Sequence, residues 1–124
     1  MGLQRTIHFP TDSRPTWESV RSAFQTLAEV PIVRMIDNLP AFPDEIPEAG
    51  WRELRIGLSG GMVTIRASSA GWDCVIWGNA DPLLTRSWDT TCWAIATAGQ
   101  GRVMLEDGNS LTAEEFRTRA FDAP

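Results

Sequence analysis

Residues 71–104 read GWDCVIWGNADPLLTRSWDTTCWAIATAGQGRVM and carry the clearest start and stop signals in the chain. The first part of this stretch, Trp72 to Trp77, is rich in aromatic and β-branched residues and ends at Gly78-Asn79. That pattern is typical of a strand followed by a turn. Side chains alternate between the two faces of a strand, and here both faces carry apolar residues. The stretch therefore predicts a strand in the interior of a sheet.

The second part of the stretch predicts a helix. Its apolar residues recur at steps of three and four, at Leu84, Trp88, Cys92 and Ile95. Asp81 is suited to the N-cap, and Pro82 fits the first turn, where a missing N–H costs nothing. Gly99 is placed for a left-handed C-terminal cap. We expect a helix over 82–98, followed by a short strand over 102–105.

The rest of the chain adds further strands and helices around this centre. In order they are a strand at 3–9, an amphipathic helix capped among residues 11–13 and stopped by Pro31, a strand at 32–36, a hairpin of strands 51–58 and 62–67, and a last helix at 113–121 opened by the capping box Thr112 to Glu115. The order β-α-β-β-β-β-α-β-α predicts one α+β domain over 1–124. We expect a two-layer sandwich with a mainly antiparallel sheet of about six strands and three helices, for which a ferredoxin-like variant would fit.

Two registers fit the predicted hairpin. A Gly60-Gly61 loop sets Arg55 opposite Arg66, whereas a Ser59-Gly60 loop sets Glu53 opposite Arg66. Like charges directly opposite each other destabilise a sheet, so we favour the second register or a bulged three-residue loop. Either way, the polar face of the hairpin carries two arginines.

Composition limits the classes of partner and location. The chain has 124 residues, 43% hydrophobic and 22% charged, as in an ordinary globular domain. A net charge of -5 argues against binding to nucleic-acid phosphates. No signal peptide is evident, and no apolar run approaches the ~20 residues of a membrane span. We expect a cytoplasmic protein in which Cys74 and Cys92 are free thiols, unless their two faces pack together and form a disulfide.

Most catalytic chemistry is excluded by missing residue types. Residues 57–61 match G-x-S-x-G, but a strand follows the serine where a nucleophile elbow needs a helix, and the single histidine, His8, lies upstream. One histidine and two distant cysteines give no zinc-site spacing. All 11 cations are arginine, and tyrosine is absent, so no Schiff-base lysine, phosphate-binding lysine or phenol is available. We expect no catalytic residue, metal or cofactor.

The leading functional hypothesis is a protein-binding surface on the hairpin. Trp51 opens its strand on the side that Glu53 and Arg55 share, and Arg66 lies across from them. Tryptophan beside arginine is the composition of protein interfaces. We take Trp51, Arg55 and Arg66 as candidate partner-binding residues, beside an acidic, proline-rich loop at 39–50. The chain would be a small non-enzymatic module of the accessory or immunity type that binds another protein, and a homodimer stays open.

The alternative hypothesis is a small-molecule-binding or weakly catalytic domain. Alternation places Asp73 on the same side of its strand as Val75 and Trp77, close to Asn79 in the following turn. Asp73, Trp77 and Asn79 are therefore candidate pocket residues. This hypothesis predicts a mostly apolar cavity with a few converging polar groups at that end of the strand.

Overall fold

The computed structural model describes residues 2–10, 14–42, 44–69, 71–78 and 81–122. Its strands are β1 (Leu3–His8), β2 (Ile32–Ile36), β3 (Leu39–Pro40), β4 (Glu53–Leu58), β5 (Gly61–Ala67), β6 (Trp72–Ile76), β7 (Arg102–Met104) and β8 (Ser110–Thr112). Its helices are α1 (Trp17–Gln25), α2 (Pro82–Gly99) and α3 (Ala113–Arg117), which continues as the π-helical turn η1 (Thr118–Asp122).

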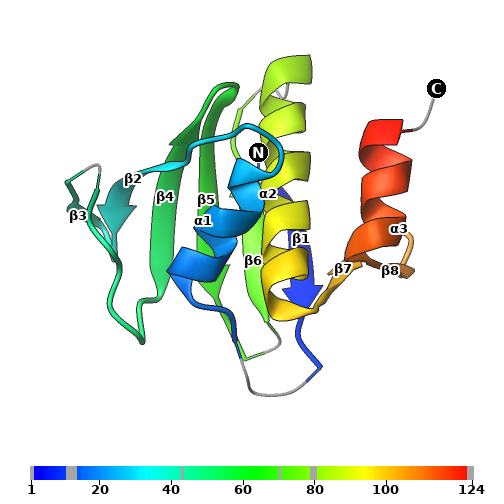
Figure 1. Cartoon of the computed structure of the whole chain (residues 1–124), viewed down its shortest axis with the longest axis horizontal. Helices are drawn as coiled ribbons and strands as arrows, with labels where there is room; N and C mark the ends of the chain where they lie inside the picture. The colour runs from blue at the N-terminus through cyan, green and yellow to red at the C-terminus, as the bar shows by residue number, and fades with distance from the viewer. Residues whose placement is uncertain (1, 11–13, 43, 70, 79–80, 123–124) are drawn as a thin grey trace.

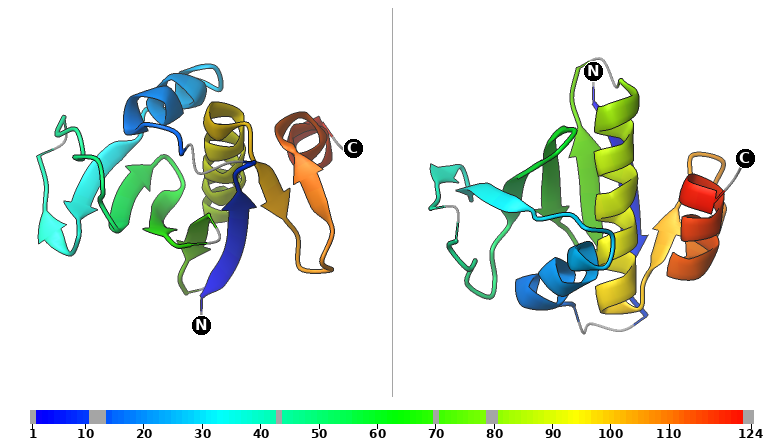
Figure 2. Two further views of the ribbon diagram at one scale, coloured as in Figure 1. Left: turned by 90° about the horizontal axis from the view of Figure 1, so that it is seen from below. Right: turned by 45° about the horizontal axis from the view of Figure 1, so that its top comes forward.

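All the strands belong to one open antiparallel sheet of eight, in the order β3-β2-β4-β5-β6-β1-β7-β8. The helices lie together on one face of this sheet, with α2 across its centre (Figures 1 and 2). The α+β class and the antiparallel sheet are thus confirmed. The ferredoxin-like variant is not shown, since β1 and β2, which flank α1, have β4, β5 and β6 between them.

Two strands were missed because they are too short to produce a sequence pattern. β3 forms at the start of the segment that we expected to be an irregular loop, and β8 lies in the turn before the last helix. Both form the edges of the sheet. The capping box at the start of α3 is confirmed, with Glu115 N–H donating to Thr112 Oγ1 at 3.2 Å.

Helix α2 begins as predicted and ends differently. Asp81 is its N-cap, with Oδ1 accepting from Leu84 N–H at 2.8 Å. The left-handed C-terminal cap is Gln100, with φ of 52°, and Gly99 is still helical. Gly99 has a different role, because a Cβ there would lie only 2.5 Å from Cε1 of Phe9. Its small size admits the aromatic ring that packs against this end of the helix.

Helix α1 is also shorter than expected. Thr16 is its N-cap and accepts from Ser19 N–H at 3.2 Å, so Pro15 precedes the helix. The caps expected at 11–13 lie outside the described residues. The helix ends at Gln25, and Ala28 at φ of 58° turns the chain before it reaches Pro31.

The core lies between the sheet and α1 and α2. Strands β1, β2, β4, β5, β6 and β7 send apolar side chains into it, and the helices contribute Trp17, Val20, Phe24, Trp88, Cys92 and Ile95. Burying one large apolar side chain of this kind stabilises the fold by roughly 1.5–3 kcal/mol. Trp72 belongs to this core with 3% of its surface exposed, whereas Trp77 is 51% exposed. Trp72, in β6, is therefore a core residue, whereas Trp77, just after β6, is not.

The β4–β5 hairpin has the register favoured by charge. Leu58 pairs with Gly61 across a Ser59-Gly60 loop, and Glu53 lies opposite Arg66. The hairpin tip docks on the start of α2, where Gly60 N–H donates to Ser87 Oγ at 2.9 Å.

Candidate functional site

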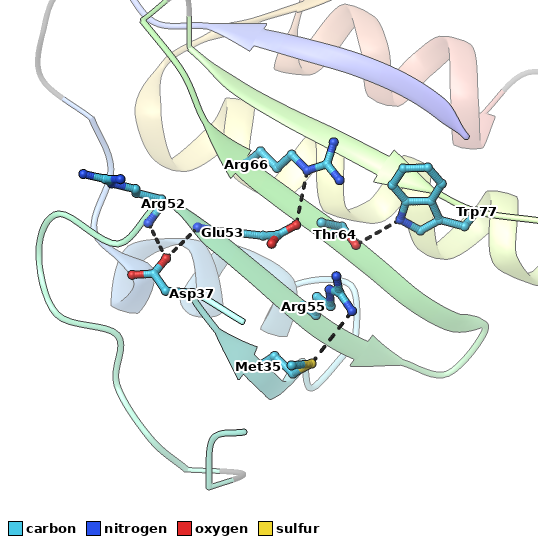
Figure 3. Close-up of polar contacts among 8 residues, drawn as sticks. All are labelled: Met35, Asp37, Arg52, Glu53, Arg55, Thr64, Arg66 and Trp77. Carbon is cyan, nitrogen blue, oxygen red and sulfur yellow. Dashed lines mark hydrogen bonds and ion pairs between the residues drawn. The ribbon is translucent and has the colours of Figure 1, made fainter. Parts of the chain in front are cut away.

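One face of the sheet is covered by helices, and we call the opposite face the open face. Figure 3 looks onto it, with the helices behind the strands. Strand alternation places on this face Met35 of β2, Glu53 and Arg55 of β4, Met62, Thr64 and Arg66 of β5, and Asp73 and Val75 of β6. None of the helices in the described part of the chain covers these side chains.

Arg55 carries a buried, unsatisfied guanidinium nitrogen on the open face. Its Nη1 contacts only the sulfur of Met35, at 3.9 Å, which is a weak acceptor. Its Nε is buried and has no acceptor among the described residues. A buried donor without a partner costs about 1–3 kcal/mol, and more when the group is charged. No carboxylate in the described ranges lies within ion-pair distance of Arg55.

The neighbouring Arg66 is satisfied by contrast. Its Nε donates to Glu53 Oε1 at 3.2 Å, and its guanidinium carbon lies 5.3 Å from the centre of the Trp77 ring (Figure 3). Both members of the ion pair are partly exposed, so the pair contributes about 0–1 kcal/mol. The ion pair matters more for Arg55. It engages Glu53, which is the carboxylate closest in sequence to Arg55.

Trp77 forms the apolar part of the open face. Its indole Nε1 donates to Thr64 Oγ1 at 3.4 Å (Figure 3). Gly2 approaches both Trp77 and Val75, to the point that a Cβ on Gly2 would lie 2.8 Å from the Trp77 ring. Thr64 and Val75 are thereby buried although no helix covers them.

The structure brings together residues from both sequence hypotheses. Arg55 and Arg66, expected to bind a partner, share the open face with Asp73 and Trp77, expected to line a pocket. Asp73 accepts from Thr6 Oγ1 at 2.7 Å and lies opposite Arg66 in register. Asn79, the third candidate pocket residue, lies outside the described residues.

Trp51 is placed elsewhere. It is half-buried and packs edge-on against Trp72, with ring centres 4.8 Å apart, at the border of the core. Sequence alternation failed for Trp51 because the regular strand starts only at Glu53.

A cleft of about 750 Å³ opens beside Trp51, and we call it the Trp72 cleft. It lies between residues 14–18, which lead into α1, the loop 46–52 and the turn at 67–69, with Trp17 and Trp72 among its lining residues. Arg14 closes one side by donating from Nη2 to the Ser68 carbonyl at 2.6 Å. No local pattern announces this cleft, because its tryptophans come from three separate segments.

The structure has two smaller clefts. One of about 700 Å³ runs between the end of α2 and the start of α3, beside His8 and Trp93. The other, of about 470 Å³, adjoins Arg5 and Asp89. None of the three clefts is lined by Asp73 or Trp77. A pocket around those two residues stays a hypothesis.

The two cysteines are buried neighbours and both are free thiols. Burial raises the pKa of Cys74 well above its ordinary value, and the adjacent Cys92 raises that pKa further. Cys74 is therefore a thiol at neutral pH, and it does not have the lowered pKa of a reactive cysteine. Across the described ranges, no three His, Cys, Asp or Glu side chains gather as metal ligands.

No described helix combines the length and apolar character that crossing a membrane requires. Comparisons with protein-family models, with curated proteins and with solved structures gave no match to this chain. Its function has to be inferred from the chemistry of the open face and the clefts.

Proposed function

We propose that this chain is a non-enzymatic module of the accessory or immunity type, and that its open face binds an acidic segment of another protein. The observation that carries the proposal is the guanidinium of Arg55. It is half-buried, it has a buried Nε without an acceptor, and its one polar contact is to a sulfur atom. Because this Nε is buried, the Arg55 side chain must shift outward for a carboxylate from a partner to supply the missing acceptor.

The distribution of charge on the open face supports an acidic partner. Arg34 lies over Gly57, since a Cβ there would be 3.2 Å from Arg34 Nε, which adds a third arginine beside Arg55 and Arg66. The carboxylates of this face are engaged within the chain, Glu53 by Arg66 and Asp73 by Thr6. The chain as a whole carries a net charge of -5, so this face differs in sign from the protein around it.

Exposed apolar groups on the same face supply contact area. Trp77 is 51% exposed and Met62 is 44% exposed. Tryptophan and arginine dominate the binding energy of protein interfaces, and methionine adapts its shape to a partner. The expected segment therefore combines carboxylates with at least one apolar side chain.

Docking on the face is favoured over pairing at a sheet edge. The edge strands β3 and β8 have two and three residues, and β3 ends in Pro40, which has no N–H to donate. An edge of that length offers few backbone groups to another strand. The open face is broader and carries the unpaired guanidinium.

Selection of short random peptides displayed on phage tests the proposal without knowledge of the natural partner. The wild-type chain is the target, and bound peptides are sequenced and measured by fluorescence anisotropy. We expect enrichment of Asp and Glu beside apolar residues. Binding to Arg55→Met should be weaker by about tenfold or more, since a hydrogen bond to a charged group contributes about 1.5–3 kcal/mol.

Arg21→Met is the matched control, because it removes the same charge from α1 on the other side of the sheet. It should bind the selected peptides as the wild type does. Peptides without acidic enrichment, or equal affinity for Arg55→Met, would contradict the proposal. Analytical ultracentrifugation adds a second criterion: a dimer that Arg55→Met dissociates would assign the open face to a second copy of this chain.

A further inference from the structure

One of the residues that line the Trp72 cleft carries a buried hydrogen-bond donor that the fold leaves unused. Trp72 is 3% exposed, it lines the cleft, and its indole Nε1 has no acceptor among the described residues. An indole nitrogen can only donate, so it needs an oxygen. Other tryptophans find one within the chain, as Trp88 does at the Cys74 carbonyl, 3.0 Å away.

Further donors line the same cleft. The first turn of the nine-residue helix α1 opens onto it through Thr16, Trp17 and Glu18. The first backbone N–H groups of any helix have no partner within it, and they carry the positive end of the helix dipole. Arg14 is fixed at the rim by the Ser68 carbonyl, which occupies only one of the five N–H groups of its guanidinium.

The cleft also has an apolar part that includes Trp51 and Ile46, and Phe9 supports the Trp72 ring from outside the cleft. Phe9 and Trp51 hold the Trp72 ring by edge-on contacts, with ring centres 5.4 and 4.8 Å from it. Trp51 is half-buried, and Ile46 in the same loop is 53% exposed. A volume of about 750 Å³ lies within the range of roughly 300–1,000 Å³ that is typical of small-molecule sites.

From these groups we propose that the Trp72 cleft binds a small aromatic carboxylate, independently of the open face. The aromatic body lies against Trp51 and Ile46. The carboxylate faces Arg14 and the start of α1, and accepts the Trp72 N–H. Because that nitrogen is buried, side chains packed around the Trp72 ring must move before the carboxylate reaches it.

Glu18 and Glu48 also line the cleft and are exposed. Together with Arg14 and Arg52 they make the charged lining neutral overall. The carboxylate is therefore selected by the directed donors rather than by net charge. This makes an amine of the same shape the most informative comparison, because the two glutamates would favour it if charge alone decided binding.

Titration of the isotope-labelled full chain by ¹H–¹⁵N NMR tests the site with naphthalene-2-carboxylate as the probe. The six tryptophans give separate indole N–H signals that can be assigned. We expect the Trp72 N–H signal to move downfield and the Trp88 signal to stay in place. The amine 2-(aminomethyl)naphthalene should bind at least about tenfold more weakly, as the loss of charge-assisted hydrogen bonds implies.

Arg14 is exposed, so Arg14→Met should fold, and it should weaken binding of the carboxylate about tenfold. Arg21→Met, within α1, should bind it unchanged. An unmoved Trp72 signal at millimolar probe, or equal binding of the amine, would overturn the proposal. Arg55→Met should leave this titration unaffected, so the outcome is separate from that of the peptide selection.

Discussion

Arg5 of β1 and Asp89 of α2 form an ion pair on the helix-covered face, with Nη1 and Oδ1 2.5 Å apart. The guanidinium also lies 3.7 Å from the centre of the Trp88 ring. Burial lowers the pKa of Arg5, but Cys92 and Asp89 outweigh it and raise that pKa above its ordinary value. The Arg5 charge thus lies largely buried between the sheet and α2, and it depends on Asp89 as its counter-ion.

Replacing Asp89 should therefore destabilise the fold strongly. Asp89→Asn leaves the Arg5 charge in place without its counter-ion, and we expect a loss of about 3 kcal/mol in the free energy of unfolding, measured with urea. The double variant Arg5→Met, Asp89→Leu removes both charges and should recover most of that loss. If Asp89→Asn is as stable as the wild type, the ion pair does not compensate a buried charge.

The tip of the β4–β5 hairpin should tolerate no side chain at Gly60. A Cβ there would lie 2.0 Å from the Leu83 carbonyl oxygen at the start of α2, a backbone atom that cannot turn away. We expect Gly60→Ala to cost about 3 kcal/mol or more by separating the hairpin from the helix. Gly57→Ala in β4 is the control, since its nearest neighbour is the flexible Arg34 side chain at 3.2 Å, and it should cost far less.

Local features decided what the sequence could predict. The N-cap of α2, the capping box of α3 and the Glu53–Arg66 register all depend on residues close in sequence or directly opposed across a hairpin. The role of Gly99 depends instead on Phe9, which is far away in sequence. β3 and β8 are too short for alternation to reveal them.

The candidate sites were predicted only in part for the same reason. Alternation along the strands groups Arg55 with Arg66 and Asp73 with Trp77, but it does not show that the two pairs share one face of the sheet. Alternation gives no sign that Arg55 lacks an acceptor. The lack arises because a register shift between Val33 and Met35 sets the Met35 thioether opposite Arg55. The Trp72 cleft depends on contacts between three distant segments, so it is visible only in the folded chain.

Trp77 and Trp88 should differ sharply in their contribution to stability. Trp88 is 3% exposed and donates to the Cys74 carbonyl, so Trp88→Ala should cost about 3–5 kcal/mol. Trp77 is half exposed, and Trp77→Ala should cost about 1 kcal/mol or less. Urea unfolding followed by circular dichroism measures both. Equal losses would mean that the Trp77 indole is part of the core and not a group available to a partner.

Asp37 should make the stability of the fold depend on acid pH. It lies in the β2–β3 turn, and its Oδ1 accepts from the backbone N–H groups of Arg52, at 2.7 Å, and Glu53, at 2.9 Å (Figure 3). These two bonds lower the pKa of Asp37 below its ordinary value. Because the folded-state pKa is the lower one, the stabilisation is complete above the unfolded-state pKa and is lost as the pH falls through the folded-state pKa.

We therefore expect the free energy of unfolding to fall between about pH 5 and pH 2, and to fall less steeply in Asp37→Asn, which keeps an acceptor but binds no proton. Asp107 and Glu115, whose pKa values are also lowered by hydrogen bonds, should retain part of the slope in that variant. Urea unfolding at a series of pH values compares the two chains. Identical slopes in Asp37→Asn and the wild type would mean that the hydrogen bonds from the backbone of Arg52 and Glu53 do not stabilise the ionised carboxylate. The ionised Asp37 would then not anchor the end of the loop 46–52, which lines the Trp72 cleft.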